Sequence, residues 1–454
     1  MNEKKNDPIV HGLSRKLAEF TVEFKIDSVP DVVLENAKIA ILDCLGVALL
    51  GAREEIGQIL LRFARKNFSP GPCTVWGSDI SANPRDAALL NGTLAHGLDY
   101  DDRGHASTYT LASAIAAAES HDAPGVRVLE AFIVGREIRM CLDQLFSARL
   151  RGTGPGARGW HSNGILGPIA CACATSKVLR LDVNHTLAGI GLATGSCGAL
   201  TRDGGTMAKP FRAGQAAATG LTCALLAEEG LTSDTASIEG NRGLLDALGP
   251  IEEDILETLG KDLGVQFDLA NPGVKAKQFP CCTGTHAGLE AMLRLSGKRR
   301  LRSDEIDRME LDVHPNTLLR THPAKGFEGR FSLPFCLAIA LIYGPPGPEH
   351  FTDAYACDPN VRDIVERTRH VPGSKQLIVH LKDGTKLAEP IQPPMDLTSW
   401  KEVCSKFEGC VREILPESRR VALIDAVSHL QEIPSLRPLC DPLCVGGAVS
   451  QTNA

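Results

Sequence analysis

Several long segments of this chain place apolar residues three or four positions apart, and this spacing constrains the fold more than any other feature. The clearest segments are residues 32–51, 164–181 and 210–233. The spacing is that of one face of an α-helix. Gly51 closes the first segment and Pro210 opens the last, as is typical of helix ends and starts. Because many of their residues are alanine, glycine or cysteine, we expect closely packed helices in a compact domain.

After about residue 265 the pattern of the sequence changes. Residues 308–315 and 375–391 alternate apolar and polar side chains as strands do, and the Lys-Asp-Gly-Thr sequence at 382–385 is a hairpin turn signal. Between the two strand-like segments, residues 331–344 and 359–370 have helical spacing. This mixture predicts a smaller α+β domain.

At 454 residues the chain is long enough for two domains. We predict a mainly α fold, with a large all-helical domain at residues 1–268 and a smaller α+β domain at residues 269–395. C-terminal helices at residues 396–454 are expected to rejoin the helical domain. The 43% hydrophobic and 23% charged residues are ordinary for a globular protein with a sizeable core.

Charge and hydropathy argue against two classes of partner. The net charge is −7 and no basic run with interleaved aromatic residues occurs, so we expect no nucleic-acid partner. No apolar run approaches the roughly 18 residues of a membrane-spanning helix. The charged segment 1–16 lacks the apolar core of a signal peptide. We therefore expect a cytoplasmic protein with no membrane partner.

The sequence contains no recognisable cofactor or structural-metal motif. Its fifteen cysteines are scattered without paired C-x2-C spacing, so reduced, mostly buried thiols are expected rather than a zinc site. The glycine-rich residues 152–159 are interrupted by a proline and do not follow the dinucleotide-binding pattern. They are interpreted as a flexible loop or as a loop that delivers His161. We expect no cofactor and no metal.

Residues 90–108 place two histidines and three carboxylates within nineteen positions. Three interpretations are open for this stretch. It can be a solvated helix end, a metal site with Asp99, Asp102 and His105 as ligands, or a buried acid–base cluster in which an aspartate orients a histidine.

Cations are grouped in two other places. Lys209 and Arg212 flank a proline at an expected helix start, where free N–H groups and the helix dipole favour an anion. We interpret this as a carboxylate-sized anion site, with a solvated helix start as the alternative. Lys277 precedes a proline-marked turn, and His286 lies in the first turn of the next helix, where a packed histidine is the alternative to a functional one.

These stretches together resemble the MmgE/PrpD family, which includes 2-methylcitrate dehydratases, cis-aconitate decarboxylases and iminodisuccinate epimerases. The resemblance is carried by ILDCLGVALLG, NGTLAHGLDYDD, the stretch at His161, AKPFRAGQAAATG, KQFPCCTGTH and GRFSLPFCLAIALIYG, in this order. It implies a helical domain with an α+β lid domain, a homodimer, and an active site between the domains. It also implies action on small di- or tricarboxylates without an organic cofactor.

Matching motif to motif, the resemblance implies that Asp99, His105, His161 and Lys209 occupy active-site positions and that Lys277 begins a lid motif. Two positions depart from the family pattern. Arg103 stands where a small hydroxyl residue is frequent, and Phe335 stands where the decarboxylases carry a tyrosine. We expect the substrate pocket to differ accordingly.

We therefore predict a cofactor-independent lyase, a dehydratase or decarboxylase, that abstracts a proton next to a substrate carboxylate. An epimerase or isomerase of a small dicarboxylate and a non-catalytic carboxylate-binding homologue are the alternatives. His161 is the leading acid or base, His105 its partner, and Asp99 orients a histidine. Lys209 would hold a carboxylate. The predicted substrate-binding residues are Arg103, Arg212, Lys277, His286 and Phe335.

Overall fold

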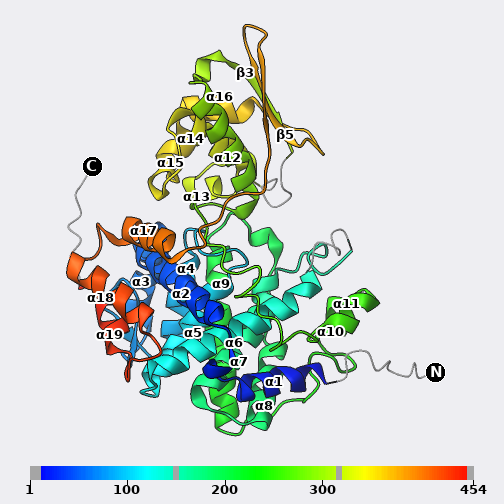
Figure 1. Cartoon of the computed structure of the whole chain (residues 1–454), viewed down its shortest axis with the longest axis vertical. Coiled ribbons are helices and arrows are strands. Elements are labelled where there is room, and N and C mark those ends of the chain that lie inside the picture. The colour runs from blue at the N-terminus through cyan, green and yellow to red at the C-terminus, as the bar shows by residue number, and fades with distance from the viewer. Residues whose placement is uncertain (1–11, 147–152, 313–319, 447–454) are drawn as a thin grey trace.

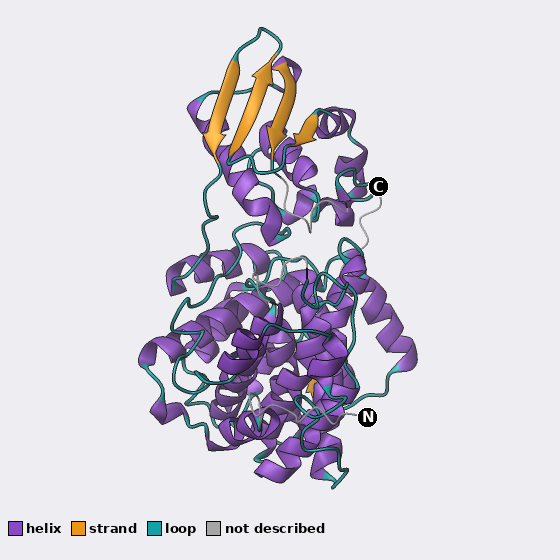
Figure 2. Cartoon of the chain, turned by 90° about the vertical axis from the view of Figure 1, so that its right-hand side faces the viewer, coloured by secondary structure: helices purple, strands orange, loops and turns teal. Residues whose placement is uncertain are grey.

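The computed structural model describes residues 12–146, 153–312 and 320–446, and it shows a large helical body with a smaller body at one end (Figure 1). The smaller body contains a four-stranded sheet with helices beneath it (Figure 2). The mainly α fold with a small sheet-containing region is confirmed. No helix in the described part of the chain is long and apolar enough to cross a membrane.

The large body is built from helices in the first 260 residues and from the C-terminal helices. The first group is α1 (Leu13–Glu23), α2 (Asp31–Gly51), α3 (Glu55–Asn67), α4 (Pro84–His96), α5 (Ala106–Ser120), α6 (Gly125–Asp143), α7 (Ser162–Leu179), α8 (Val183–Gly195), α9 (Ala208–Glu228), α10 (Leu244–Leu248) and α11 (Glu253–Thr258). The second group is α17 (Trp400–Val411), α18 (Glu417–Ser428) and α19 (Arg437–Cys440). The body is not strictly all-helical, because β1 (Cys73–Thr74) and β2 (Ser81–Ala82) form a short antiparallel pair.

The smaller body, called the lid below, comprises the described residues between 279 and 391. Its helices are α12 (Thr283–Lys298), α13 (Gly326–Gly329), α14 (Leu333–Ile342), α15 (Asp353–Cys357) and α16 (Pro359–Glu366). Its strands β3 (Ile306–Leu311), β4 (Thr368–His370), β5 (Gln376–Leu381) and β6 (Lys386–Pro390) lie in the order β4-β3-β5-β6. Short 3₁₀ turns cover Ile26–Ser28, Gln144–Phe146, Thr201–Asp203, Ser303–Glu305, Pro348–His350 and Asp441–Leu443.

Most elements expected from the sequence are found. The segments expected as helices at 32–51, 164–181 and 210–233 correspond to α2, α7 and α9, and the hairpin signal joins β5 to β6. The helix expected at 359–370 is shorter than predicted, because its last three residues form β4 beside β3. Of the strand expected at 308–315, the last three residues lie outside the described part of the chain.

Buried apolar residues form two separate clusters. The larger draws on residues 13–276 and again on 403–443, so the C-terminal helices pack on the body. The smaller cluster draws on residues 279–381 and forms the core of the lid. The domain boundaries 268 and 395 stay a prediction. All fifteen cysteines are free thiols.

Helices α4 and α9 cross at glycines, and this crossing positions the C-terminus of α4 and the N-terminus of α9, which carry residues of the candidate site. A Cβ atom at Gly214 would lie 2.1 Å from the backbone oxygen of Leu89 and 2.1 Å from the hydroxyl of Thr93. A Cβ atom at Gly92 would lie 3.0 Å from the Cα atom of Gly214. The helices therefore touch backbone to backbone, which brings the C-terminus of α4 next to the N-terminus of α9.

Replacing Gly214 with alanine should separate the two helices. Overpacking of this kind costs about 1–3 kcal/mol of unfolding free energy, and here the obstacle is backbone that cannot rotate away. The matched control is Gly409→Ala in α17, where the new Cβ meets nothing within 4 Å and where a gain of about 0.4–1 kcal/mol is expected. Urea unfolding of both variants checks this. Equal stabilities would contradict the close crossing.

Candidate active site

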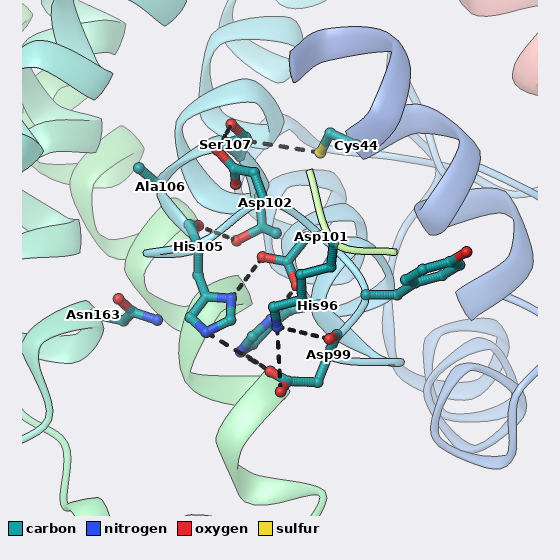
Figure 3. Close-up of polar contacts among 12 residues, drawn as sticks. Cys44, His96, Asp99, Asp101, Asp102, His105, Ala106, Ser107 and Asn163 are labelled. Atoms are coloured by element: carbon teal, nitrogen blue, oxygen red, sulfur yellow. Dashed lines mark hydrogen bonds and ion pairs between the residues drawn. The ribbon is translucent and has the colours of Figure 1, made fainter. Parts of the chain in front are cut away.

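The loop that joins α4 to α5, residues 97–105, carries the candidate site. Asp99 and His105 have positive φ angles of 52° and 65°, which non-glycine residues rarely adopt. Such backbone conformations persist where the surrounding structure holds them, and they concentrate at functional sites. The two left-handed residues turn the chain back on itself, so that the rings of His96 and His105 lie 4.2 Å apart between centroids (Figure 3).

The charged groups of this loop are buried, so the interpretation as a solvated helix end is wrong. Asp99 is 3% exposed and Asp101 is fully buried. The carboxylate of Asp101 contacts Nδ1 of His96 at 2.9 Å through one oxygen and Nδ1 of His105 at 2.7 Å through the other. Because an ionised carboxylate only accepts hydrogen bonds, both histidines carry their proton on Nδ1. The Nε2 atoms of both rings are therefore lone-pair acceptors.

Burial and charge set the protonation states of this group. Burial, reinforced by the charge of Lys209, lowers the pKa of His105 to about 3 and also lowers the pKa of His96. Burial alone would raise the pKa of Asp101, but the two histidines hold it well below its usual range. At neutral pH the group is one carboxylate between two neutral imidazoles. We expected Asp99 to orient a histidine, whereas the carboxylate nearest to both rings is that of Asp101.

Asp99 instead gathers two lysine ammonium groups. Nζ of Lys209, on the first turn of α9, donates to Oδ1 of Asp99 at 2.5 Å and contacts Nε2 of His96 at 2.9 Å. Nζ of Lys277 lies 3.3 Å from Oδ2 of Asp99 and donates to its backbone oxygen at 2.7 Å. Burial opposes ionisation, yet the two lysines hold the pKa of Asp99 well below its usual range. Likewise Asp99 keeps the pKa of the buried Lys277 above its usual value.

The residues that could bind a metal ion in the structure differ from those predicted from the sequence. His96, Asp99, Asp101 and His105 have ligand-type atoms within 4.8 Å of one another. Asp102, which we had named as a possible ligand, is instead ion-paired with Arg136 and accepts from the hydroxyl of Ser107 at 2.9 Å. Asp99 already contacts two ammonium groups, which supply the positive charge that an ion would bring. A site without metal stays our prediction.

His161 caps the N-terminus of α7 beside this cluster. Its Nδ1 accepts a hydrogen bond from the backbone N–H of Asn163 at 3.3 Å. A ring that accepts at Nδ1 carries its proton on Nε2, the opposite tautomer to that of His105. Burial lowers the pKa of His161 well below its usual value, and the neighbouring charge of Lys209 lowers it further.

The body supports the start of α7 with a buried arginine. The guanidinium of Arg139 donates to Ser162 at 3.0 Å and to the side-chain oxygen of Asn163 at 3.2 Å. It also pairs with Asp143 at 2.8 Å, and its side chain is 1% exposed. These contacts fix the residues that follow His161.

Two of the predicted substrate-binding residues are engaged elsewhere in the body. Nε of Arg103 pairs with Asp396 at 2.6 Å, which ties the site loop to the chain that returns from the lid. Arg212 is part-exposed and contacts Asp203 at 3.3 Å and Gln215 at 2.6 Å. Lys277, in contrast, reaches the cluster as described.

The two predicted lid residues lie inside the lid. His286 is fully buried, and its Nε2 lies 3.2 Å from the backbone oxygen of Cys281. Phe335 is 1% exposed and packs on Phe351 at 5.9 Å between ring centroids. The lid aromatic that reaches the cluster is Phe331, whose ring centroid is 5.3 Å from Nζ of Lys209.

Sequence reasoning therefore missed the roles of His96, Asp101 and Phe331. His96 and Asp101 lie within residues 90–108, which the sequence marks as a candidate site. Their partners, however, depend on a turn that sequence spacing does not show. Phe331 precedes α14 and is separated from Phe335 by one helical turn. Only the docking of the lid shows which of the two aromatic residues meets Lys209.

Comparison with known proteins gives two matching family models. They are the MmgE/PrpD N-terminal domain over residues 15–254 and the MmgE/PrpD C-terminal domain over residues 279–431. The cis-aconitate decarboxylase of Mus musculus is 24% identical, covering 94% of this chain and 90% of that protein. The human cis-aconitate decarboxylase is 26% identical, covering 90% of each chain. The mitochondrial 2-methylcitrate dehydratase of Yarrowia lipolytica is 24% identical, covering 84% of this chain and 79% of that protein.

The depressed pKa of His105 predicts a pH-dependent contribution to stability. An unfolded histidine has a pKa of about 6.5, whereas folded His105 has a pKa of about 3. Between these values the unfolded chain binds more protons, so the unfolding free energy falls as the pH falls. The stability difference between wild type and His105→Gln should shrink by up to about 1.4 kcal/mol per pH unit below pH 6. Urea unfolding at pH 6.5, 5.5 and 4.5 measures it, and a pH-independent difference would contradict the neutral, buried state.

Removing Lys209 should weaken catalysis without unfolding the protein. Asp99 keeps Lys277 as an ionic partner in Lys209→Ala, so no carboxylate is left unpaired. Losing one charge-assisted contact to a substrate carboxylate should lower kcat/KM by about 1.5–3 kcal/mol of transition-state stabilisation. Lys66→Ala, on the exposed end of α3, is the control. Unchanged kinetics in Lys209→Ala would refute the role of Lys209 as the anion site.

Proposed function

The chain belongs to the MmgE/PrpD family, and on that premise we propose that it is a cofactor-independent lyase, a dehydratase or decarboxylase acting on a small di- or tricarboxylate. One observation carries the proposal. His105 and His161 are neutral histidines of opposite tautomer close to a buried pair of lysines. Nε2 of His105 lies 3.7 Å from Oδ1 of Asp99, whose carboxylate both lysines contact, and His161 is near enough to Lys209 for that charge to lower its pKa. This arrangement combines a proton acceptor, a proton donor and a receptor for carboxylates in one place.

His105 is the proposed base. Its Nδ1–H is held by Asp101, so its Nε2, which lies 3.7 Å from Oδ1 of Asp99, keeps a lone pair that can take the proton from the carbon beside a substrate carboxylate. The imidazolium that forms is stabilised by the same carboxylate, as in other acid–base pairs of this kind. His96, held by the other oxygen of Asp101, keeps that carboxylate in position and accepts from Lys209.

Lys209 and Lys277 are the proposed anion receptor. An ammonium group has three N–H donors. The hydrogen bonds of Lys209 to Asp99 and His96 use two of these donors. The third can take a substrate carboxylate and stabilise the enolate charge that develops when the proton leaves. The ring of Phe331, whose centroid is 5.3 Å from Nζ of Lys209, is apolar, and a low-dielectric neighbour strengthens the attraction between an ammonium group and a carboxylate.

His161 is the proposed acid. Its Nε2–H is the donor that remains when Nδ1 caps the helix. In a dehydration the C–O bond breaks, the electron pair of the former C–H bond forms the C=C bond, and the donated proton leaves with the hydroxyl group as water. In a decarboxylation no C–H proton is removed: the C–C bond to the carboxylate breaks, carbon dioxide leaves, and the electron pair that stays on the carbon takes the proton donated by His161.

Opposite tautomers on separate elements also suit a second function. An epimerase needs an acceptor and a donor on the two faces of one carbon, and His105 and His161 come from the N-termini of two different helices, α5 and α7. Such an enzyme would return a proton to the opposite face and expel nothing. A non-catalytic carboxylate-binding protein would not need either tautomer.

The test is proton NMR of a small panel of acids incubated with the enzyme in heavy water with a chelator present. The panel contains citrate, 2-methylcitrate, cis-aconitate, tartrate and an aspartate-derived acid. A lyase releases water or carbon dioxide from at least one acid, and His161→Asn should slow that turnover by about 10²–10⁴-fold. Inversion of a stereocentre without any elimination product would support the epimerase. No turnover of any acid would refute both, and activity restored only by a divalent ion would assign a metal to the cluster.

A further inference from the structure

Besides Lys209 and Lys277, a further buried lysine, Lys406, contacts the site loop. Within the described part of the chain, its polar contacts are with Tyr100 and Asp43 and with no histidine or aspartate of the loop. Its Nζ donates to the backbone oxygen of Tyr100 at 2.6 Å and lies 3.9 Å from the centroid of the Tyr100 ring. It also pairs with Oδ1 of Asp43 at 2.7 Å. The side chains of Lys406 and Asp43 are 3% and 1% exposed. Tyr100 stands between Asp99 and Asp101, the two carboxylates that organise the site.

The fold brings this pair together from distant parts of the chain. Asp43 lies in α2 and Lys406 in α17, and the two helices approach closely at Gly46, where a Cβ atom would lie 2.9 Å from the ring of Phe407. Burying two charges is expensive, and a buried ion pair is often no more stabilising than two apolar residues of the same volume. Stability alone therefore does not explain the pair, whereas the contact with the Tyr100 carbonyl does.

Two successive carbonyls of the site loop are each held by a lysine. Lys277 donates to the carbonyl of Asp99 at 2.7 Å, and Lys406 donates to that of Tyr100 at 2.6 Å. These carbonyls directly follow the left-handed φ angle of Asp99, where regular helix hydrogen bonds are not available to them. Their orientation sets the peptide planes on both sides of Tyr100, and hence the directions of the Asp99 and Asp101 side chains.

The hydroxyl of Tyr100 adds a link to the chain that enters the lid. It donates to the backbone oxygen of Gln278 at 3.3 Å, next to Lys277. The ring of Tyr100 is thus fixed at one end by the chain entering the lid and on its face by the ammonium of Lys406.

We propose that Lys406, supported by Asp43, is a positioning residue that holds the Tyr100 carbonyl so that Asp99 keeps its lysines and Asp101 keeps its histidines. Its kinetic consequence rests on the proposed function, but its effect on the loop does not. Lys406 touches no reacting atom and acts through the backbone of residues 99–101.

The test replaces the pair by apolar residues in the double variant Asp43→Leu/Lys406→Met, which leaves no buried charge unpaired. Amide hydrogen exchange of the whole chain, followed by mass spectrometry, should show at least tenfold faster exchange in residues 97–105. If the proposed function holds, kcat should fall at least tenfold while KM changes less than threefold.

The matched control is Lys177→Met at the C-terminal end of α7, far from His161 at the other end. Nζ of Lys177 also donates to backbone carbonyls, those of Val22 and Phe24, and lies 5.7 Å from the ring of Phe24. This variant loses the same kind of contact elsewhere, so exchange should rise near residues 22–24 while residues 97–105 and kcat stay as in wild type. Loop exchange raised equally in Lys177→Met would mean general loosening and would overturn the proposal.

Loop exchange that is unchanged in the double variant would overturn the proposal, as would faster exchange with unchanged kcat. If the double variant does not fold, the smaller change Lys406→Gln is measured in the same way, and wild-type exchange and kcat in that variant would overturn it. A wild-type enzyme that turns over no acid would contradict the proposed function, and the exchange result would then decide the role of Lys406 by itself.

Discussion

The buried contact between Asp99 and two lysines is the interaction on which the rest of the site depends. Asp99 lies in a left-handed turn and binds Lys209 from α9 and Lys277 from the chain entering the lid. Two ammonium groups this close would repel each other in a low-dielectric interior without a carboxylate between them. Asp99 therefore keeps the anion receptor assembled before a substrate carboxylate arrives.

The carboxylate of Asp101 organises the histidines of the same cluster. Asp101 is shared by His96 and His105 and fixes both rings in one tautomer. Since burial and neighbouring positive charge lower the pKa of His105 to about 3, its Nε2 is an unprotonated acceptor at neutral pH. One loop thus carries a counter-ion for cations at Asp99 and an orienting group for bases at Asp101, two positions apart.

The lid is joined to this loop through its connecting segments. The chain entering the lid and the chain leaving it pair with each other where Ala276 and Leu397 exchange backbone hydrogen bonds. Arg103 binds both, through its backbone N–H to Lys275 at 3.0 Å and through its side chain to Asp396 at 2.6 Å. Movement of the lid would therefore displace the site loop. Arg103 thus has a structural role that is independent of substrate recognition.

Much of the fold was predictable because it depends on local periodicity. The three-and-four spacing of α2, α7 and α9 and the turn signal between β5 and β6 are properties of short segments, and the structure confirms them. The failure at residues 368–370 was not local in cause: they continue a helical pattern, but pairing with β3, which lies far away in the sequence, makes them a strand. The grouping of histidines and carboxylates in residues 90–108 likewise marked the site without any knowledge of its geometry.

The sequence by itself determined which groups are available: a loop rich in aspartate and histidine, and lysines at a helix start and before a proline turn. Only the tertiary structure decided how they are shared. Whether a carboxylate is solvated or buried, and whether it meets a lysine or a histidine, depends on contacts between residues more than a hundred positions apart, such as Asp99 with Lys209. A left-handed turn at Asp99, held by its surroundings, directs two neighbouring aspartates to different partners. That division of roles is a property of packing, because no spacing in the sequence distinguishes Asp99 from Asp101.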